Sequence, residues 1–284
     1  MGTVRVALIG DVGGHADELS AELAALGVDA NGRLPHDLVV IQVGDLIHRG
    51  PDSAGVVALV DHFLTTQPGQ WIQLVGNHET HYLRPPMFRW DEQLDHQTVA
   101  TVRRWWLGYQ AHVAVSVRTA TESYLVTHAG VTRPFWRRVL RSATDTAHAA
   151  ELINIFARVD GDKIHRAGSM LNAGAPNLSA GPIWADTATE LVPSWTGYRL
   201  PFSQVHGHTT MVDWRIAHPD THPNTTDTTY DFDAKHEVIG FDGGRIVGID
   251  PGHRSDATRP WRSLVLPFCE WPQVRAGGIY AESV

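Results

Sequence analysis

The chain carries at residues 44–50 the stretch Gly44-Asp45-Leu46-Ile47-His48-Arg49-Gly50, directly after an apolar run at residues 37–43. Similar short apolar runs at residues 4–9 and 70–75 also end in a glycine followed by a polar residue. Such runs, rich in β-branched residues, predict buried strands. Leucines and valines at helical spacing over 16–26 and 53–65 predict helices after the first two strands. This alternation indicates an α/β fold.

Five polar clusters follow predicted strands, and they begin at Gly10, Gly44, Gly76, Thr127 and His206. Strand ends in a layered α/β fold converge on one edge, where ligands bind, so we expect the clusters to share one site. Their carboxylate, amide and imidazole groups match divalent metals such as Mn, Fe, Zn or Co. Two such ions roughly 3.5–4 Å apart can clamp a phosphoryl group. The clusters therefore predict a metal centre for hydrolysis at phosphorus.

Composition restricts the function and the compartment of the 284-residue chain. The formal net charge of -8 argues against an extended nucleic-acid surface, because such surfaces are strongly basic. The single cysteine, Cys269, excludes an intrachain disulfide and fits a reducing compartment. Neither a secretory leader nor an apolar run of membrane-spanning length is found, so we expect a cytoplasmic protein without a membrane partner. The sequence does not specify an oligomeric state.

The motifs GDLIHRG, VGNHE, THAG, IWAD and HGHT occur in this order between residues 44 and 210. With the opening Gly10-Asp11, they resemble the calcineurin-like metallophosphoesterase superfamily over about residues 4–250. The motifs are most similar to the phosphoprotein phosphatase branch and its bacterial relatives, which include diadenosine tetraphosphatases. The resemblance implies a single domain over residues 1–284, with a four-layer α/β sandwich of two mixed β-sheets flanked by helices.

The resemblance also implies a role for each matching residue. Two divalent metal ions would be bound, with Mn the first choice and Fe, Zn, Co or Ni as alternatives. Asp11 would bind the first ion, Asp45 would bridge both, and the second would be held by Asn77, His128 and His208. His78 would give a proton to the leaving group. Arg49, together with Asn77, would bind the substrate phosphate.

Two positions depart from the family pattern. The first motif normally reads GDxHG, but Gly13 stands where the metal-binding histidine is expected. The second normally reads GDxxDRG, but His48 replaces the aspartate that orients the GNHE histidine. Three interpretations follow: His48 binds the first metal instead, His15 binds it, or the first site is weak or empty. If His48 binds the metal, His78 loses its carboxylate partner and its pKa should fall.

Further assignments rest on position alone. His206 and His208 lie two residues apart and would share one face of an extended strand, so His206 could be a ligand, a group that orients one, or a packed residue. Arg166 and Arg199 fall in the irregular region 160–200 and are candidates for substrate phosphate binding. Residues 202–205 predict the strand before His206. The later stretches 212–217, 238–241, 245–249 and 263–266 predict strands of antiparallel type separated by turns. The polar segment 218–236 predicts an exposed loop.

The favoured function is hydrolysis of a phosphate ester by direct attack of a metal-bound hydroxide. The substrate would be a small phosphorylated molecule, a nucleotide or a phosphoprotein. One alternative, which the changes at Gly13 and His48 keep open, is a catalytically impaired pseudo-phosphatase that binds a phosphorylated ligand or partner. Another is a dinucleoside polyphosphate hydrolase, which would release two nucleoside diphosphates rather than inorganic phosphate.

Overall fold

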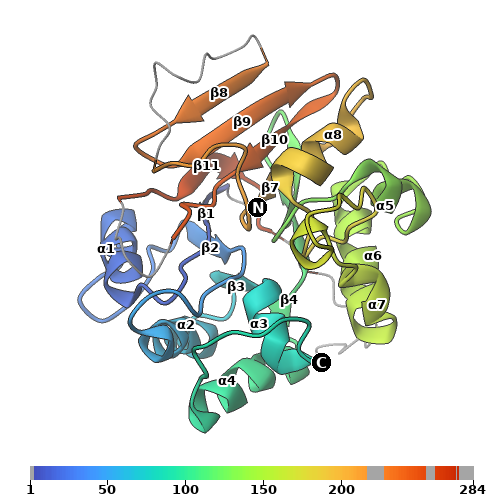
Figure 1. Cartoon of the computed structure of the whole chain (residues 1–284). Helices are drawn as coiled ribbons and strands as arrows, with labels where there is room; N and C mark the ends of the chain where they lie inside the picture. Colours follow the sequence, from blue (N-terminus) through green and yellow to red (C-terminus); the bar gives the residue numbers. More distant parts are fainter. Residues whose placement is uncertain (1–2, 216–226, 254–259, 273, 275–284) are drawn as a thin grey trace, which may run out of the picture.

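Two mixed β-sheets form the centre of the protein in the computed structural model, which describes residues 3–215, 227–253, 260–272 and 274 (Figure 1). The first sheet has the order β11 (Leu264–Cys269), β1 (Val4–Ile9), β2 (Leu38–Gln42), β3 (Trp71–Leu74) and β4 (Ala111–His112). Its strands are parallel except for β11. The second sheet has the order β5 (Ala114–Arg118), β6 (Ser123–Thr127), β7 (Ser203–His206), β10 (Gly244–Gly248), β9 (His236–Phe241) and β8 (Thr228–Asp231).

The helices lie in two groups beside the two sheets (Figure 1). The first group is α1 (Ala16–Leu26), α2 (Ser53–Thr66), α3 (Asn77–Leu83) and α4 (His96–Leu107). The second is α5 (Arg133–Arg138), α6 (Thr146–Val159), α7 (Gly161–Ile164), the 3₁₀ turn η1 (Ser169–Leu171), the π-helical turn η2 (Thr187–Leu191) and α8 (Val192–Trp195). Aspartates cap the N-termini of three of these helices. The side-chain oxygens of Asp52, Asp95 and Asp145 accept hydrogen bonds from backbone N–H groups in the first turns of α2, α4 and α6.

The strands of the first sheet are apolar on both faces because both faces are covered. Val6 and Leu8 of β1 pack into the core between the sheets, whereas Ala7 and Ile9 face the core shared with the helices. This matches the continuous apolar runs expected for parallel strands covered on both sides. The predicted four-layer arrangement of two mixed sheets with flanking helices is confirmed.

Several local predictions were wrong. Residues 212–215 form turns rather than a strand, and residues 216–217 lie outside the described part of the chain. The predicted loop at 218–236 contains strand β8, while its residues 218–226 are not described. The antiparallel pairing predicted for the later strands is confirmed for β9 with β10 and for β11 with β1, whereas β7 pairs parallel with β10. No helix within the described ranges is long and apolar enough to cross a membrane.

The loops that follow β2 and β3 touch each other closely. Gly44 has a φ of 107°, and a Cβ atom there would lie 2.4 Å from the backbone nitrogen of Gly76. A side chain at Gly44 would therefore push the two loops apart, so glycine is needed for this approach. The contact brings Asp45 and Asn77, the residues that follow these glycines, to one edge of the sheets.

Candidate metal centre

Three residues from separate strand ends place donor atoms together. Asp45 follows β2, His128 follows β6 and His208 follows β7, and one donor atom from each lies within 4.8 Å of the others. All three side chains are buried. Nε2 of His128 lies 2.9 Å from Oδ1 of Asn77 and 3.4 Å from Oδ1 of Asp45. The structure thus gathers four residues that were predicted to bind metal.

The proton on His128 can be assigned from its partners. Its Nδ1 lies 3.1 Å from the carbonyl oxygen of Val43, which can only accept a hydrogen bond, so Nδ1 carries the proton. Burial lowers the pKa of His128, which keeps the ring neutral. Its Nε2 lone pair then faces the oxygens of Asn77 and Asp45. Three acceptors that converge repel one another unless a cation lies between them, so these residues fit a bound metal ion.

The backbone around Asp45 is held by one buried carboxylate. Glu79 accepts the N–H groups of Gly76, Asp45 and Leu46, each at 2.8 Å. Asp45 has a φ of 54°, an unusual value for a residue with a side chain, and these bonds help to maintain it. Oδ1 of Asp45 in turn accepts the N–H of His78 at 3.0 Å. The loop after β2 is therefore fixed to the start of α3.

Three buried carboxylates lie near one another at this edge. The pKa of Asp11 is raised well above its usual value by burial and by the negative charges of Asp250 and Asp45. Burial also raises the pKa of Asp250. The positive charge of Arg49 acts in the opposite direction on both. A divalent cation would relieve the remaining repulsion, which is a second reason why the site fits metal ions.

Asp250 was missed by the sequence analysis. It follows β10 in the same way that Asp11 follows β1, with one apolar residue, Ile249, between the strand and the carboxylate. The signal was present as an aspartate after a predicted strand, but no recognised motif drew attention to it. Asp11 is tied to the cluster through Oδ1, which accepts the N–H of His208 at 3.0 Å.

His48 lies beside His78. The two Nδ1 atoms are 2.6 Å apart, and Nε2 of His48 lies 2.8 Å from the hydroxyl of Tyr82. Both ring nitrogens of His48 are thus engaged away from the Asp45 cluster, so the structure does not bring it among the candidate ligands. Burial lowers the pKa of His48 to about 3 and that of His78 to about 4, so both rings are neutral near pH 7. Nε2 of His78 lies 3.8 Å from Oδ2 of Asp45 and thus faces the centre.

The other two candidate histidines are also apart from this cluster. The ring of His15 stacks on that of His253, with centroids 4.5 Å apart. His206 is fully buried and its Nδ1 lies 2.8 Å from the carbonyl oxygen of Gly207. Neither belongs to the group of donor atoms formed by Asp45, His128 and His208 within the described ranges.

The three candidate arginines differ in position. Arg49 interacts electrostatically with the carboxylates of the centre and donates a hydrogen bond from Nη1 to the carbonyl of His253 at 3.0 Å. Arg199 forms an exposed ion pair with Asp242. Arg166 is exposed, and its side chain makes no hydrogen bond or ion pair with any other residue that the structure describes. Among the three, only Arg49 is joined to the site by a described contact.

Aromatic rings border the centre. The half-buried Trp90 packs against His78 with ring centroids 4.6 Å apart, and the guanidinium of Arg49 lies 5.9 Å from its ring. Trp184, from the IWAD motif, meets the ring of His208 edge-on at 6.0 Å. Phe88 lies between the two tryptophans. These rings can present an apolar wall to a substrate beside Arg49.

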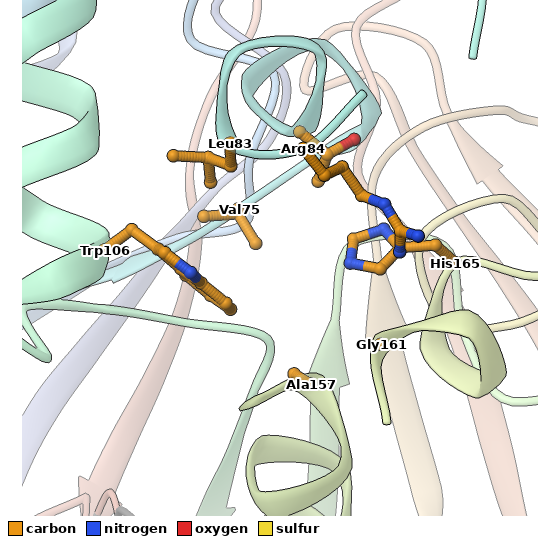
Figure 2. Close-up of a pocket in the computed structure, with 8 residues that line it drawn as sticks. Val75, Leu83, Arg84, Trp106, Ala157, Gly161 and His165 are labelled. Atoms are coloured by element: carbon orange, nitrogen blue, oxygen red, sulfur yellow. The ribbon is translucent and has the colours of Figure 1, made fainter. Parts of the chain in front are cut away.

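A separate small cavity of about 180 Å³ lies at the far end of α3. Its lining combines apolar side chains with the guanidinium of Arg84 and the imidazole of His165, which point toward each other (Figure 2). Burial, together with the charge of Arg84, lowers the pKa of His165 to about 3. None of the candidate metal ligands lines this cavity, so it is not the substrate site predicted from the motifs.

Residues 4–210 match the model of the calcineurin-like phosphoesterase family, and the chain belongs to this family. It is a metallophosphoesterase, a hydrolase of phosphate esters. Its fold is similar to that of a cold-active protein-tyrosine phosphatase from a psychrophilic Shewanella species, with 15% identity and a TM-score of 0.51 over 91% of this chain and 74% of that one. A protein serine/threonine phosphatase from Saccharomyces cerevisiae has 12% identity and a TM-score of 0.44, over 89% of this chain and 69% of that one. No curated protein matches the sequence.

Proposed function

We propose that the chain is a phosphatase that hydrolyses phosphate monoesters at a two-metal centre. The observation that carries this proposal is the convergence of acceptor atoms from Asp45, Asn77 and His128, which repel one another without a cation. His208 completes the second metal site. Divalent ions at such a centre polarise phosphoryl oxygens and make a bound water nucleophilic near neutral pH. Manganese and a cytoplasmic location are part of the proposal, as is a single domain over residues 1–284.

For the first metal, we assign Asp11, Asp45 and Asp250. Gly13 offers no side chain, and the carboxylate of Asp250 interacts with those of Asp11 and Asp45. One oxygen of Asp250, Oδ1, accepts the N–H of Gly252 at 2.7 Å, which fixes the carboxylate orientation. A ligand carboxylate held by a backbone hydrogen bond is typical of metal sites. The third carboxylate thus compensates for the missing histidine.

His78 gives the proton to the leaving group in this account. The hydroxyl of Tyr82 accepts the N–H of Leu94 at 3.3 Å, which leaves its own proton for Nε2 of His48. His48 then donates from Nδ1 to Nδ1 of His78, so His78 carries its proton on Nε2, the atom nearer Asp45. When the leaving oxygen takes this proton, Nδ1 of His78 takes the proton of His48 and Nε2 of His48 takes that of the Tyr82 hydroxyl, so no imidazolate forms. Arg49 binds the phosphate, because its planar guanidinium matches two phosphoryl oxygens. His48 therefore sets the tautomer of His78 where relatives use a carboxylate.

The wall formed by Phe88, Trp90 and Trp184 supports a substrate with an apolar or aromatic leaving group, such as an aryl phosphate or a nucleotide. Aromatic rings stack on bases and phenyl groups, and Trp90 lies next to Arg49. Dinucleoside polyphosphates are the alternative substrates, and analysis of the products distinguishes the two activities. Their symmetric cleavage gives two nucleoside diphosphates, whereas phosphatase activity gives inorganic phosphate.

The role of His78 is tested by comparing two substrates in the His78→Gln variant. Removal of a general acid costs roughly 10²–10⁴-fold when the leaving group needs a proton. We expect a large loss of kcat with an alkyl phosphate and a much smaller loss with p-nitrophenyl phosphate, whose leaving group departs without one. The Asp242→Asn variant, changed in an exposed ion pair, should match the wild type. Equal losses with both substrates would contradict the assignment.

A further inference from the structure

A second group of potential metal ligands lies apart from the Asp45 cluster. His15 precedes α1, Glu18 lies in its first turn, and His253 follows β10. One donor atom from each lies within 4.8 Å of the others. Oε1 of Glu18 is 3.9 Å from Nδ1 of His15, and Oε2 of Glu18 is 3.5 Å from Nε2 of His253. Two imidazoles and a carboxylate are a donor set that zinc and related ions bind.

The polar atoms of this group are buried without hydrogen bonds. His15 is 5% exposed and His253 is 2% exposed. Nε2 of His15, Oε1 of Glu18 and both ring nitrogens of His253 have no hydrogen-bond partner among the residues that the structure describes. Each such group costs about 1–3 kcal/mol when it is taken from water and left unpaired. The stacking of the His15 and His253 rings does not offset the cost of burying these four polar atoms without hydrogen bonds.

A single cation would bind one nitrogen of each ring together with the carboxylate of Glu18. Ligands about 2.0–2.1 Å from a tetrahedral zinc ion lie roughly 3.3 Å from one another. The observed 3.5 and 3.9 Å separations between Glu18 and the two rings are close to this value. We propose that His15, Glu18 and His253 form a separate site for one divalent transition-metal ion of the zinc type. Water would fill the fourth position, since the side chain of Glu18 is 18% exposed.

Neighbouring contacts hold the three ligands in place. The indole Nε1 of Trp261 donates to Oε2 of Glu18 at 2.8 Å, which orients the carboxylate. The carbonyl of His253 accepts the hydrogen bond from Arg49. The ion therefore ties the start of α1 to the segment after Asp250 and, through this bond, to the phosphate-binding arginine. Its ligands are different residues from those proposed for the two catalytic ions, so the site does not depend on the proposed activity.

Cobalt binding tests the proposal without an activity measurement. The catalytic centre is first disabled with Asp45→Asn and His208→Ala, and the metal-free double variant is titrated with Co²⁺. Equilibrium dialysis gives the number of bound ions, and visible absorption reports tetrahedral coordination. We expect one ion per chain with tetrahedral absorption, and loss of both when His253→Gln or Glu18→Gln is added. Adding His148→Gln instead, an exposed histidine on α6, should change neither.

A milder substitution, which leaves the three ligands in place, controls for variants that lose cobalt because they do not fold. Trp261→Phe in the same background removes the N–H that orients Glu18, and such outer contacts are worth roughly 10–100-fold in metal affinity. We expect weaker Co²⁺ binding by about that factor, with an unchanged circular dichroism spectrum. The proposal is overturned if the double variant binds no cobalt, or if its cobalt binding is the same with and without His253→Gln.

Discussion

Glu79 offers the sharpest prediction about how the centre is held. It is 1% exposed, and its two oxygens accept the N–H groups of Gly76, Asp45 and Leu46. These three donors belong to the loops after β2 and β3, so one side chain fixes the position of Asp45 relative to Asn77. Replacing Glu79 should therefore lower the stability of the fold and weaken metal binding at the same time.

The magnitude follows from the number of donors left unpaired. Each buried backbone N–H without a partner costs about 1–3 kcal/mol, so Glu79→Ala should destabilise the fold by about 3 kcal/mol or more. Glu79→Gln should be milder. Its amide oxygen can keep Asp45 and Gly76, which both bond to Oε2, but its amide nitrogen would face the N–H of Leu46. One unpaired donor corresponds to about 1–3 kcal/mol.

Urea unfolding followed by circular dichroism measures these free energies, and Mn²⁺ titration of the folded variants measures metal affinity. Glu270→Gln is the matched control, because the side chain of Glu270 forms an exposed ion pair with Arg118 at 3.7 Å. Such surface pairs contribute about 0–1 kcal/mol. The reasoning is refuted if Glu79→Gln is as stable as the control, or if Glu79→Ala costs no more than Glu79→Gln.

Three further predictions concern other parts of the structure. His48→Asp places a carboxylate beside His78 and should raise the pKa of His78 from about 4 by roughly 1–3 units; ¹⁵N NMR titration of the ring checks this, and an unchanged midpoint would contradict it. Folded His165 stays neutral down to about pH 3, whereas the unfolded residue takes up a proton near pH 6.5. The wild type should therefore lose about 1 kcal/mol of stability between pH 7 and 5.5 that His165→Gln does not lose, as read from urea unfolding at both values; equal losses would argue against it. Gly44→Ala should destabilise the fold by about 2 kcal/mol or more, because its Cβ would meet the nitrogen of Gly76 at a φ of 107°. A melting temperature equal to that of the wild type would exclude this clash.

The strands that carry the site could be predicted from the sequence because they are buried on both faces. Continuous apolar runs at 4–9, 37–43 and 70–75 correspond closely to β1, β2 and β3. β4 has two residues and too short a pattern to detect. Residues 212–215 resemble a strand in composition, but Val212 and Trp214 are buried in a small cluster with Tyr230 and Phe232 instead.

The grouping of Asp45, Asn77 and His128 followed from one rule, that strand ends meet at one edge of a sheet. The position of His48 could not be predicted in this way. It has a φ of 73°, and Arg49 beside it has a φ of 70°, so the loop turns in a way that sequence periodicity does not reveal. The pairing of His15 with His253 joins residues from opposite ends of the chain. No local pattern indicates it.

Metal content measured together with turnover tests the central claim most directly. The purified chain is loaded with Mn²⁺, its metal content is determined by mass spectrometry, and hydrolysis of p-nitrophenyl phosphate is followed for the wild type and for Asp45→Asn. The wild type is expected to hydrolyse the substrate, and Asp45→Asn, which changes the residue assigned to both catalytic ions, should lose activity and about two ions per chain. Equal metal content in the two proteins, or no turnover by the wild type with any divalent ion, would contradict a two-metal phosphatase.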